Sequence, residues 1–329
     1  MGPTPPAALA ISLLLSAACV PSEPVPDAPA TPRDGELVWE QRAPAPSART
    51  EVTAAATGSR IVVVGGFAED GSTSAEVHVY ETETDSWARG PHLPVGVHHA
   101  MAAAVGGAVH VFGGYLGPGL SNPIGRAFVL RENRWIELPP MPEPRAAGGA
   151  AAADGRIYVV GGVGPGGLAG ATLVFDPTRA GWTTAPGLPT PREHLGVASF
   201  EDLIYAVGGR TGGIGTNLDA AEVFDPQAGR WRPLPEMPSA RGGIAAAAST
   251  EGFVVAPGGE ADRAFDTVEA FHVPAGRWVL LPSMPTRRHG LGVAAVGSTV
   301  FVIAGGPEPG LAFSAANEAL DLSPLRREG

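Results

Sequence analysis

Residues 156–162, RIYVVGG, form a short apolar run that ends in two glycines. Five further runs of this kind occur along the chain, so that the glycine pairs end at Gly66, Gly114, Gly162, Gly209, Gly259 and Gly306. A run of β-branched and aromatic residues closed by glycines is typical of a β-strand followed by a sharp turn. The sequence therefore predicts six copies of one β-unit, with a period of 47 to 50 residues.

Six tryptophans follow the same period: Trp39, Trp87, Trp135, Trp182, Trp231 and Trp278. A period near 50 residues with glycine-pair and tryptophan signatures is typical of the blades of a β-propeller. Each unit holds four strand-length runs, which in the second unit are residues 99–105, 108–114, 126–132 and 134–140. Turn-forming residues separate these runs, as in a meander of antiparallel strands.

The composition of the runs predicts their places in a blade. The first run is almost entirely small residues, as in GAAAA at 149–153, which suits a strand crowded around a central axis. The second run is bulky and suits burial between neighbouring sheets. The tryptophan at the start of the fourth run is expected to cover the gap between blades.

The two ends of the repeat array predict how the ring closes. Trp39 precedes the first glycine pair, whereas no tryptophan follows the last pair. The segment ELVWEQ at 36–41 therefore supplies the missing outer strand of the last unit, which removes an open sheet edge. The predicted fold is all-β: a six-bladed β-propeller of four-stranded antiparallel blades, closed by the N-terminal strand.

With these features the sequence resembles the Kelch repeat family from residue 36 to about 323. The resemblance rests on the glycine pairs, the spaced tryptophans and connectors such as LPPMPEPR at 138–145. It implies a propeller that binds its partner on the face formed by the b–c loops and the d–a connections between blades. These b–c loops, at 67–75, 115–125, 210–220 and 307–316, are long and differ from one another, as recognition loops on a rigid scaffold do.

The N-terminus predicts export. Residues 1–18 read as a signal peptide, and LSAAC at 15–19 resembles a lipobox in which Cys19 is lipidated. Ordinary secretory cleavage after Ala18 is the alternative, which would give a periplasmic or secreted protein rather than a cell-envelope lipoprotein. A Pro-rich linker follows Cys19 to residue 35, the propeller spans 36–323, and 324–329 form a C-terminal tail.

Composition narrows the classes of partner. The formal net charge is −11 and all 22 basic residues are arginine, which argues against general nucleic-acid binding. The body of the chain holds no 18-residue apolar span, so we expect membrane contact only through a lipid anchor. With Cys19 as the single cysteine, no disulfide framework is expected. We expect a monomer.

A ring of basic groups at the starts of the inner strands is the first candidate site. Arginine suits bidentate capture of carboxylates, and the Kelch resemblance adds that eukaryotic Kelch adaptors bind acidic peptides with arginines near these positions. The other interpretation is structural, with each group bonded to the backbone and to acids such as Glu76, Glu222, Glu269 and Glu318. The candidates are Arg49, His98, Arg145, Arg192, Arg241 and Arg288, together with His194.

The histidines just after these positions, His99, His194 and His289, have two interpretations. As metal ligands they would have to converge from three blades, and no carboxylate of conventional spacing supports them. The interpretation favoured from the sequence is that they are packed or hydrogen-bonded side chains. No metal and no cofactor are predicted.

Enzymatic functions find little support in the sequence. No nucleophile elbow, Walker loop, HExxH or dinucleotide motif is present. A copper oxidase of the galactose oxidase kind is excluded, because its Tyr–Cys crosslink has no cysteine available in the body of the chain. The remaining catalytic alternative is a periplasmic sialic acid-type mutarotase or epimerase, to which the Kelch resemblance also extends, with His194 and Glu193 as the acid/base pair and Arg192 as the receptor of the sugar carboxylate.

The function favoured from the sequence is an exported binding module. It would recognise a protein segment or a glycan on the b–c/d–a face, and an anionic ligand of either kind fits this interpretation. A scaffold without any small ligand fits the same sequence. Arginines paired with acids of the blades would favour the scaffold, and unpaired ones would favour ligand capture.

Overall fold

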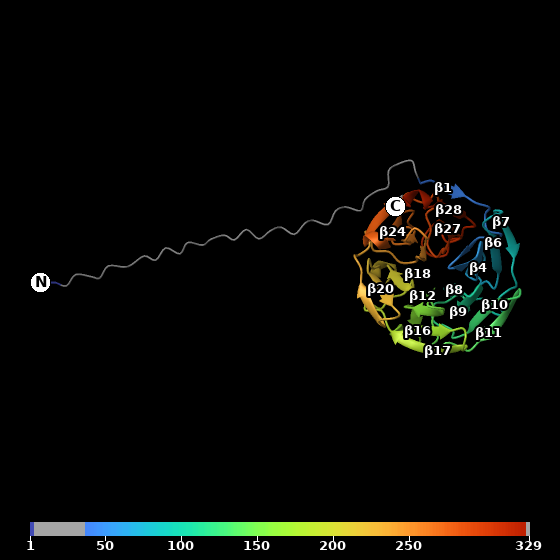
Figure 1. Cartoon of the computed structure of the whole chain (residues 1–329), viewed down its shortest axis with the longest axis horizontal. Helices are drawn as coiled ribbons and strands as arrows, with labels where there is room; N and C mark the ends of the chain where they lie inside the picture. The colour runs from blue at the N-terminus through green and yellow to red at the C-terminus, as the bar shows by residue number, and fades with distance from the viewer. Residues whose placement is uncertain (3–36, 327–329) are drawn as a thin grey trace.

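The computed structural model describes residues 1–2 and 37–326. Its regular elements are 28 strands and three 3-10 turns, and 24 of these strands form a ring of six four-stranded sheets (Figure 1). The predicted signal peptide beyond residue 2, Cys19 and the linker lie outside the described residues. Within the described part, no helix has the length and apolar character that crossing a membrane requires.

Each sheet is an antiparallel meander whose strands a to d run from the channel to the rim. Blades 1 to 3 contain β3 (Thr53–Thr57), β4 (Arg60–Val64), β6 (Val77–Glu81) and β7 (Ser86–Arg89); β8 (Met101–Val105), β9 (Ala108–Phe112), β10 (Ala127–Arg131) and β11 (Arg134–Leu138); and β12 (Gly149–Ala153), β13 (Arg156–Val160), β16 (Ala171–Asp176) and β17 (Gly181–Pro186). Blades 4 to 6 contain β18 (Gly196–Phe200), β19 (Leu203–Val207), β20 (Ala221–Asp225) and β21 (Arg230–Pro233); β22 (Ala247–Ala248), β23 (Phe253–Pro257), β24 (Val268–His272) and β25 (Arg277–Leu281); and β26 (Gly292–Val296), β27 (Thr299–Ile303), β28 (Asn317–Asp321) and β1 (Trp39–Gln41).

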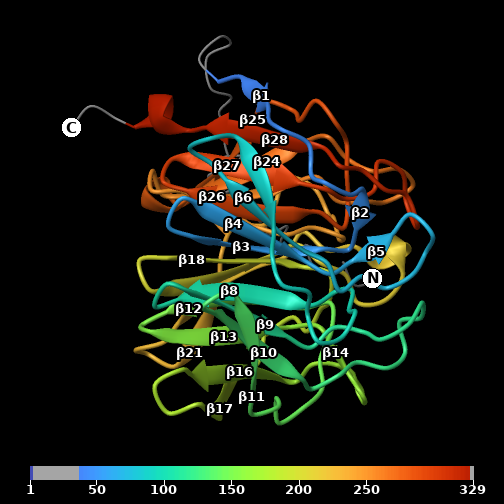
Figure 2. The same ribbon diagram turned by 90° about the vertical axis from the view of Figure 1, so that its right-hand side faces the viewer.

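Short elements mark the b–c loops and two connections. The two-stranded ribbons pair β2 (Arg49–Thr50) with β5 (Phe67–Ala68) and β14 (Val163–Gly164) with β15 (Gly167–Leu168). Figure 2 views the ring from its edge and shows β2, β5 and β14 on the same side of it, which is the b–c/d–a face. The 3-10 turns are η1 (Ile214–Thr216), η2 (Val273–Ala275) and η3 (Ser323–Leu325).

The ring closes as the sequence predicts. Strand β1 pairs antiparallel with β28, with Trp39 opposite Leu320, so the N-terminal segment is the outer strand of blade 6. The Trp39 indole N–H also donates to the carbonyl of Pro282, at 2.8 Å. This closure covers the outer edge of β28 and joins the two ends of the repeat array.

The tryptophans join neighbouring blades by hydrogen bonds. Every one of the six indole N–H groups donates to a backbone carbonyl of the preceding blade's outer connection, at 2.8 to 3.0 Å. Each indole ring packs beside the bulky b and c strands. The ring centroid of Trp182, for example, lies 5.4 Å from that of Phe112 in the preceding blade. The predicted role of these residues between blades is confirmed.

The glycine pairs allow adjacent blades to approach closely. Both glycines have positive φ, and a Cβ built on Gly113 would lie 2.0 Å from the carbonyl oxygen of Arg145 in the next blade. In blade 6 the pair is one residue earlier than the sequence suggested: Ala304 (φ 58°) and Gly305 (φ 96°) take the two conformations. Gly305 N–H accordingly bonds Arg49 O, as Gly114 N–H bonds Arg145 O.

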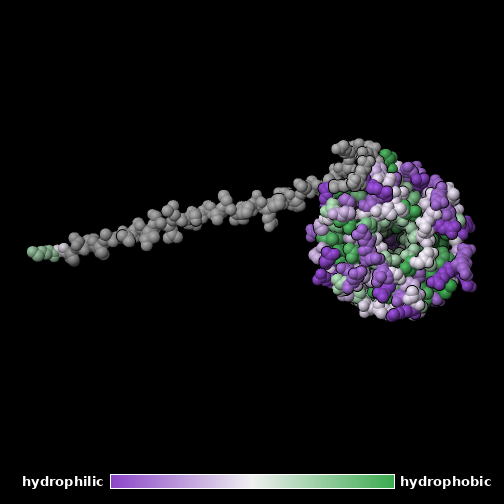
Figure 3. Space-filling view, viewed as in Figure 1, coloured by the Kyte–Doolittle hydropathy of each residue, from purple (hydrophilic) through white to green (hydrophobic). Residues whose placement is uncertain are grey.

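A channel runs along the propeller axis, and its walls are the inner strands. Two cavities of about 100 and 250 Å³ follow one another along it and share lining residues such as Ala54 and Ala102. Figure 3 looks along the axis and shows the hollow at the centre of the ring. The prediction that the small-residue strand lies innermost is confirmed, because alanines form most of the lining of the larger cavity.

Candidate functional site

The connections from one blade to the next place three successive residues at the start of each inner strand. The first of the three forms the arginine column, whose members are Arg49, Val97, Arg145, Arg192, Arg241 and Arg288. In every blade the carbonyl of this residue accepts a hydrogen bond from the second residue of the preceding glycine pair, and this common bond fixes the register.

The five arginines of this column lie inside the blades. Each is at most 1% exposed, and each donates to backbone carbonyls of its own blade. Three of them also meet a buried glutamate of the c strand: Arg192–Glu222 at 2.5 Å, Arg241–Glu269 at 2.6 Å and Arg288–Glu318 at 2.6 Å.

The remaining two arginines have other partners. Arg145 pairs with Glu143 of its own connection at 2.9 Å. Arg49 bonds His78 Nδ1 at 2.9 Å and the carbonyl of Glu76 at 3.0 Å. Burial lowers the pKa of all five guanidinium groups, and the neighbouring acids oppose this effect.

This geometry is that of the structural interpretation, in which the arginines hold strands a, b and c of each blade together. Their donors are directed at blade carbonyls and carboxylates rather than at the channel. Removing one partner of such a pair leaves a buried charge without compensation, which typically costs about 3–5 kcal/mol. We therefore assign no ligand-binding role to the five arginines of the column, Arg49, Arg145, Arg192, Arg241 and Arg288.

His98 is not a member of the arginine column. Its neighbour Val97 provides the carbonyl that bonds Gly66 N–H, so His98 lies one position further along. Opposite Val97, the c strand carries Phe128 at the register position that Glu269 occupies in blade 5. Blade 2 thus replaces the buried ion pair with an apolar pair, both members of which are buried in one hydrophobic cluster.

The third residue at the start of each inner strand forms a belt around the channel, which we call the channel belt. Its members have φ between 51° and 69°, in the left-handed region. Backbone N–H groups bond carbonyls from belt residue to belt residue, for example His99 N to Glu51 O at 3.1 Å and His194 N to Ala147 O at 2.7 Å, and Val52 N closes the ring on Gly290 O. The members are Glu51, His99, Ala147, His194, Gly243 and Gly290.

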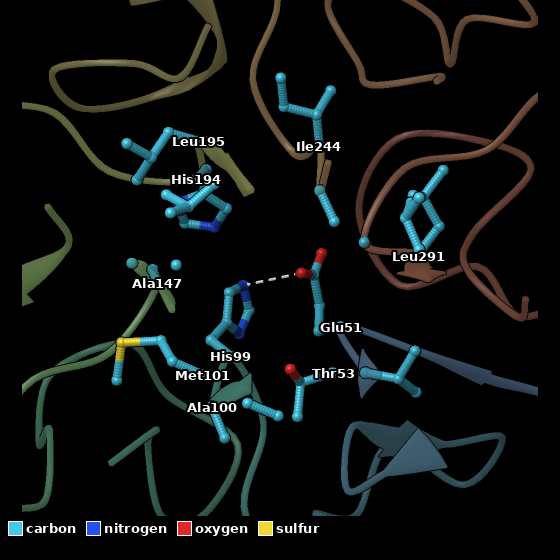
Figure 4. Close-up of a pocket in the computed structure, with 18 of the residues that line it drawn as sticks. Glu51, Thr53, His99, Ala100, Met101, Ala147, His194, Leu195, Ile244 and Leu291 are labelled. Atoms are coloured by element: carbon cyan, nitrogen blue, oxygen red, sulfur yellow. Dashed lines mark ion pairs between the residues drawn. The ribbon is translucent and has the colours of Figure 1, made fainter. Parts of the chain in front are cut away.

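Three belt side chains meet at the channel mouth. Glu51, His99 and His194 come from blades 1, 2 and 4, and all three line the smaller cavity. One ligand-type atom from each lies within 4.8 Å of the others. Figure 4 shows the His99 ring between Glu51 and His194, with the ion pair of His99 Nε2 and Glu51 Oε2 at 3.0 Å.

A chain of alternating charges continues from this cluster around the mouth, and we call it the mouth network. His289 Nδ1 lies 3.3 Å from Glu51 and 3.5 Å from Glu260. Glu260 pairs with Arg210 at 2.9 Å, and Arg210 reaches Glu193 at 3.5 Å. Residues of blades 1, 4, 5 and 6 are thereby tied together beside the channel.

The charges of the mouth network shift the pKa values of several of its members. Although burial opposes ionisation, His99 and His289 hold the pKa of Glu51 well below its usual range. Burial likewise acts against a charged His289, but Glu51 and Glu260 raise the pKa of that ring. Burial lowers the pKa of His194, and Glu193 only partly offsets it. The mouth therefore combines carboxylates with one imidazole shifted towards the neutral form, His194, and one shifted towards the protonated form, His289.

The b–c loops surround this mouth and differ in character. Exposed leucines stand on two of them: Leu116 and Leu120 in the loop of blade 2, and Leu311 in the loop of blade 6. Charged side chains stand beside them, such as Glu308 in the loop of blade 6, which pairs with Arg287 of the last blade-to-blade connection. The rim is thus a mixture of apolar and charged side chains around a polar centre.

The sequence pattern connected His99, His194 and His289 with no carboxylate, and Glu51 was missed. The signal was present, because Glu51, His99 and His194 follow the arginine column by the same two positions in their repeats. Reading His98 as the column residue moved blade 2 out of register and hid this correspondence. Arg210 and Glu260, each the residue directly after a glycine pair, were missed as well.

Comparison with known proteins agrees with the repeat pattern. A family model described as the KLHDC2/KLHL20/DRC7 Kelch-repeats domain matches residues 36–187, and a Kelch motif model matches residues 191–238. No curated protein matches the chain. Among solved structures 868 chains match, so the architecture is too widely shared to identify a function by itself.

One of the matching solved structures is that of YjhT. It superposes with a TM-score of 0.72 and 17% sequence identity, over 84% of this chain and 95% of that one. At this identity the likeness shows the fold alone.

Proposed function

The chain belongs to the Kelch-repeat family, and from this premise we propose that it is a protein-interaction module that binds a segment of a partner protein on its b–c/d–a face. The Kelch propeller fold in general suggests a protein-interaction module. The choice of face and of a protein segment is our own.

The observation that carries the proposal is where apolar side chains remain exposed. Among residues 37–326, three of the exposed large hydrophobic side chains stand on b–c loops, with exposed fractions of 40%, 53% and 60%; they are Leu116, Leu120 and Leu311. Protein interfaces use apolar anchors of this kind surrounded by polar groups. Variable loops on a rigid ring suit such recognition.

Glycan and anionic-ligand recognition receive less support from the site. The arginines that were candidates for carboxylate capture are buried and paired. The mutarotase alternative needs Arg192 to receive the sugar carboxylate, but this side chain is fully buried and bonded to Glu222 and blade carbonyls. We therefore propose the protein segment as the ligand, and a glycan remains an outcome of the test.

The test is selection from a displayed peptide library with the purified protein, followed by affinity measurement for the selected peptides. Replacing Leu116 and Leu120 by serine is expected to weaken binding at least tenfold. The matched control is Ile136→Ser, because Ile136 is a large apolar side chain exposed to 39% on the outer strand β11. Peptides that bind both variants equally, or a glycan array that yields ligands where the library yields none, would contradict the proposal.

We also propose that the protein is exported and held at the cell envelope through a lipid on Cys19, with the Pro-rich linker as a spacer. The support is the sequence of residues 1–35 alone. Mass spectrometry of the mature N-terminus in the producing cell tests this proposal: a diacylglyceryl group on Cys19 is expected. A free N-terminus at residue 19 would indicate ordinary secretory cleavage instead.

A further inference from the structure

Three side chains of the channel belt have the composition of a transition-metal site. Glu51, His99 and His194 offer one carboxylate oxygen and two imidazole nitrogens within 4.8 Å of one another. Two histidines with one carboxylate are a recurrent ligand set for zinc and for other divalent first-row metals. We propose that these three residues bind one divalent transition-metal ion at the channel mouth.

The hydrogen bonds around His99 leave a lone pair directed at Glu51. His98 Nε2 lies 3.0 Å from the carbonyl of Gly117, and because a carbonyl only accepts, this nitrogen carries the hydrogen. Neutral His98 then accepts at Nδ1, so His99 Nδ1, at 2.6 Å, is the donor between the two rings. Neutral His99 therefore has its unprotonated Nε2 facing the Glu51 carboxylate at 3.0 Å.

Two acceptors at that distance need a cation between them. The cation is either a metal ion bound by both atoms or a second proton on His99 that forms an ion pair with Glu51. The surroundings of the third side chain, His194, favour the metal.

The buried nitrogens of His194 make no hydrogen bond. The side chain is 3% exposed; Nδ1 lies 3.3 Å from the carboxylate of Glu193, but neither Nδ1 nor Nε2 makes a hydrogen bond. A buried imidazole nitrogen in this state loses the free energy of a missing hydrogen bond. A carboxylate behind one nitrogen, with the other nitrogen free, is the usual arrangement around a metal-binding histidine.

The dimensions suit a metal ion. Bonds of about 2.0–2.2 Å in a tetrahedral site place neighbouring ligand atoms about 3.3–3.6 Å apart. The His99–Glu51 separation of 3.0 Å is slightly shorter than this range and the other separations reach up to 4.8 Å, so small side-chain rotations would bring the three ligand atoms to it. His289, 3.3 Å from the other oxygen of Glu51, orients the carboxylate from behind.

Three protein ligands leave one position of a tetrahedral ion open. The three side chains line a cavity of about 100 Å³ at the channel mouth, so the open position has room for water or for a donor atom of a ligand. This inference does not depend on the proposed peptide recognition, because the belt lies beneath the loops and uses none of the exposed leucines.

The experiment is zinc binding to the full chain after treatment with EDTA and dialysis. Calorimetric titration with Zn²⁺ is expected to give one site per chain, and Co²⁺ is expected to give the absorption of a tetrahedral complex. His194→Ala and His99→Ala are expected to weaken binding at least tenfold. The control is His92→Ala, because His92 is an exposed histidine outside the cluster, and its affinity should equal that of the unchanged protein.

A second variant guards against loss of folding. Glu193→Gln keeps the size of the side chain but removes the carboxylate behind His194, and outer-shell changes of this kind typically cost about 10–100-fold in metal affinity. The melting temperature of each variant without metal shows whether it is folded. The proposal would be overturned if the unchanged protein bound no zinc, or if His194→Ala and Glu193→Gln bound zinc as tightly as the unchanged protein. The cation between His99 and Glu51 would then be a proton.

Discussion

Transplanting the apolar pair of blade 2 into blade 5 would test whether a buried ion pair of the arginine column contributes to stability only by holding its blade together. Blade 5 holds Arg241 and Glu269, each at most 2% exposed, with 2.6 Å between Nη2 and Oε1. Blade 2 has Val97 and Phe128 at the same register positions. The perturbations are therefore Arg241→Val, Glu269→Phe and the double substitution.

The magnitude follows from burial. Arg241→Val leaves the Glu269 carboxylate buried with only Ser239 as a partner, and it removes the donor from the carbonyls of Gly258 and Thr267. Breaking a buried pair costs about 3–5 kcal/mol, whereas replacing both members by well-packed apolar residues is often neutral or stabilising. We expect the single variants to lose about 3–5 kcal/mol and the double variant to lie within about 2 kcal/mol of the unchanged protein.

Urea denaturation at pH 7 measures the four free energies of unfolding, and the double-mutant cycle gives the coupling. The expected coupling is at least about 3 kcal/mol. A matched control is Arg126→Met, which removes an exposed pair with Glu137 and should cost less than about 1 kcal/mol. A double variant no more stable than Arg241→Val alone would refute the reasoning, because it would mean that the ion pair is not interchangeable with the pair in blade 2.

Three further outcomes are expected. Trp278→Phe removes an indole N–H that donates to Pro235 O at 2.8 Å in the preceding blade, and the melting curve should show a loss of about 1–3 kcal/mol; an unchanged melting temperature would contradict a role in joining blades. Burial lowers the pKa of His110 to about 4, below its unfolded value near 6.5, so the unfolded state binds the extra proton first as the pH falls. The stability linked to His110 is therefore present above pH 6.5 and decreases, by on the order of 3 kcal/mol, towards pH 4; His110→Phe should flatten this part of the curve, and an equal slope in urea denaturation would exclude it. Gly113→Ala should cost more than about 2 kcal/mol because its Cβ meets a carbonyl and its φ is 59°, whereas Ala304→Gly should change stability by less than about 1 kcal/mol because blade 6 already holds a Cβ there; equal effects in thermal unfolding would contradict the shifted register of blade 6.

The ring could be predicted from the sequence because each repeat carries its own signals. The glycine pairs, tryptophans and small inner strands recur in copy after copy, and Trp39 without a matching last tryptophan indicates the closing strand. These signals could not decide the register of a repeat where two alignments differ by one residue. Both AGG at 304–306 and VHH at 97–99 allow two registers, and only the strand pairing and the bonds between blades decide between them.

The candidate site was harder to predict because no single repeat contains more than one of its residues. Glu51, His99 and His194 each come from a different blade, and motif searches look for ligands a few residues apart. The closure of the ring brings the three inner strands together, and the common belt position sets the direction of their side chains. The buried state of the arginines was equally a property of packing, since the same residue type at the same place serves for capture when it is exposed.

The channel belt itself shows that its polar side chains are not needed for the fold. All six belt residues have φ in the left-handed region, where a non-glycine residue costs about 1–2 kcal/mol. Gly243 and Gly290 take this conformation and make the same belt bonds without that cost. A ring that served only as a scaffold would therefore be better built with glycine at Glu51, His99 and His194. That ionisable side chains stand there instead, with both buried nitrogens of His194 lacking a hydrogen bond, places the strained positions of this propeller where a ligand has access to them.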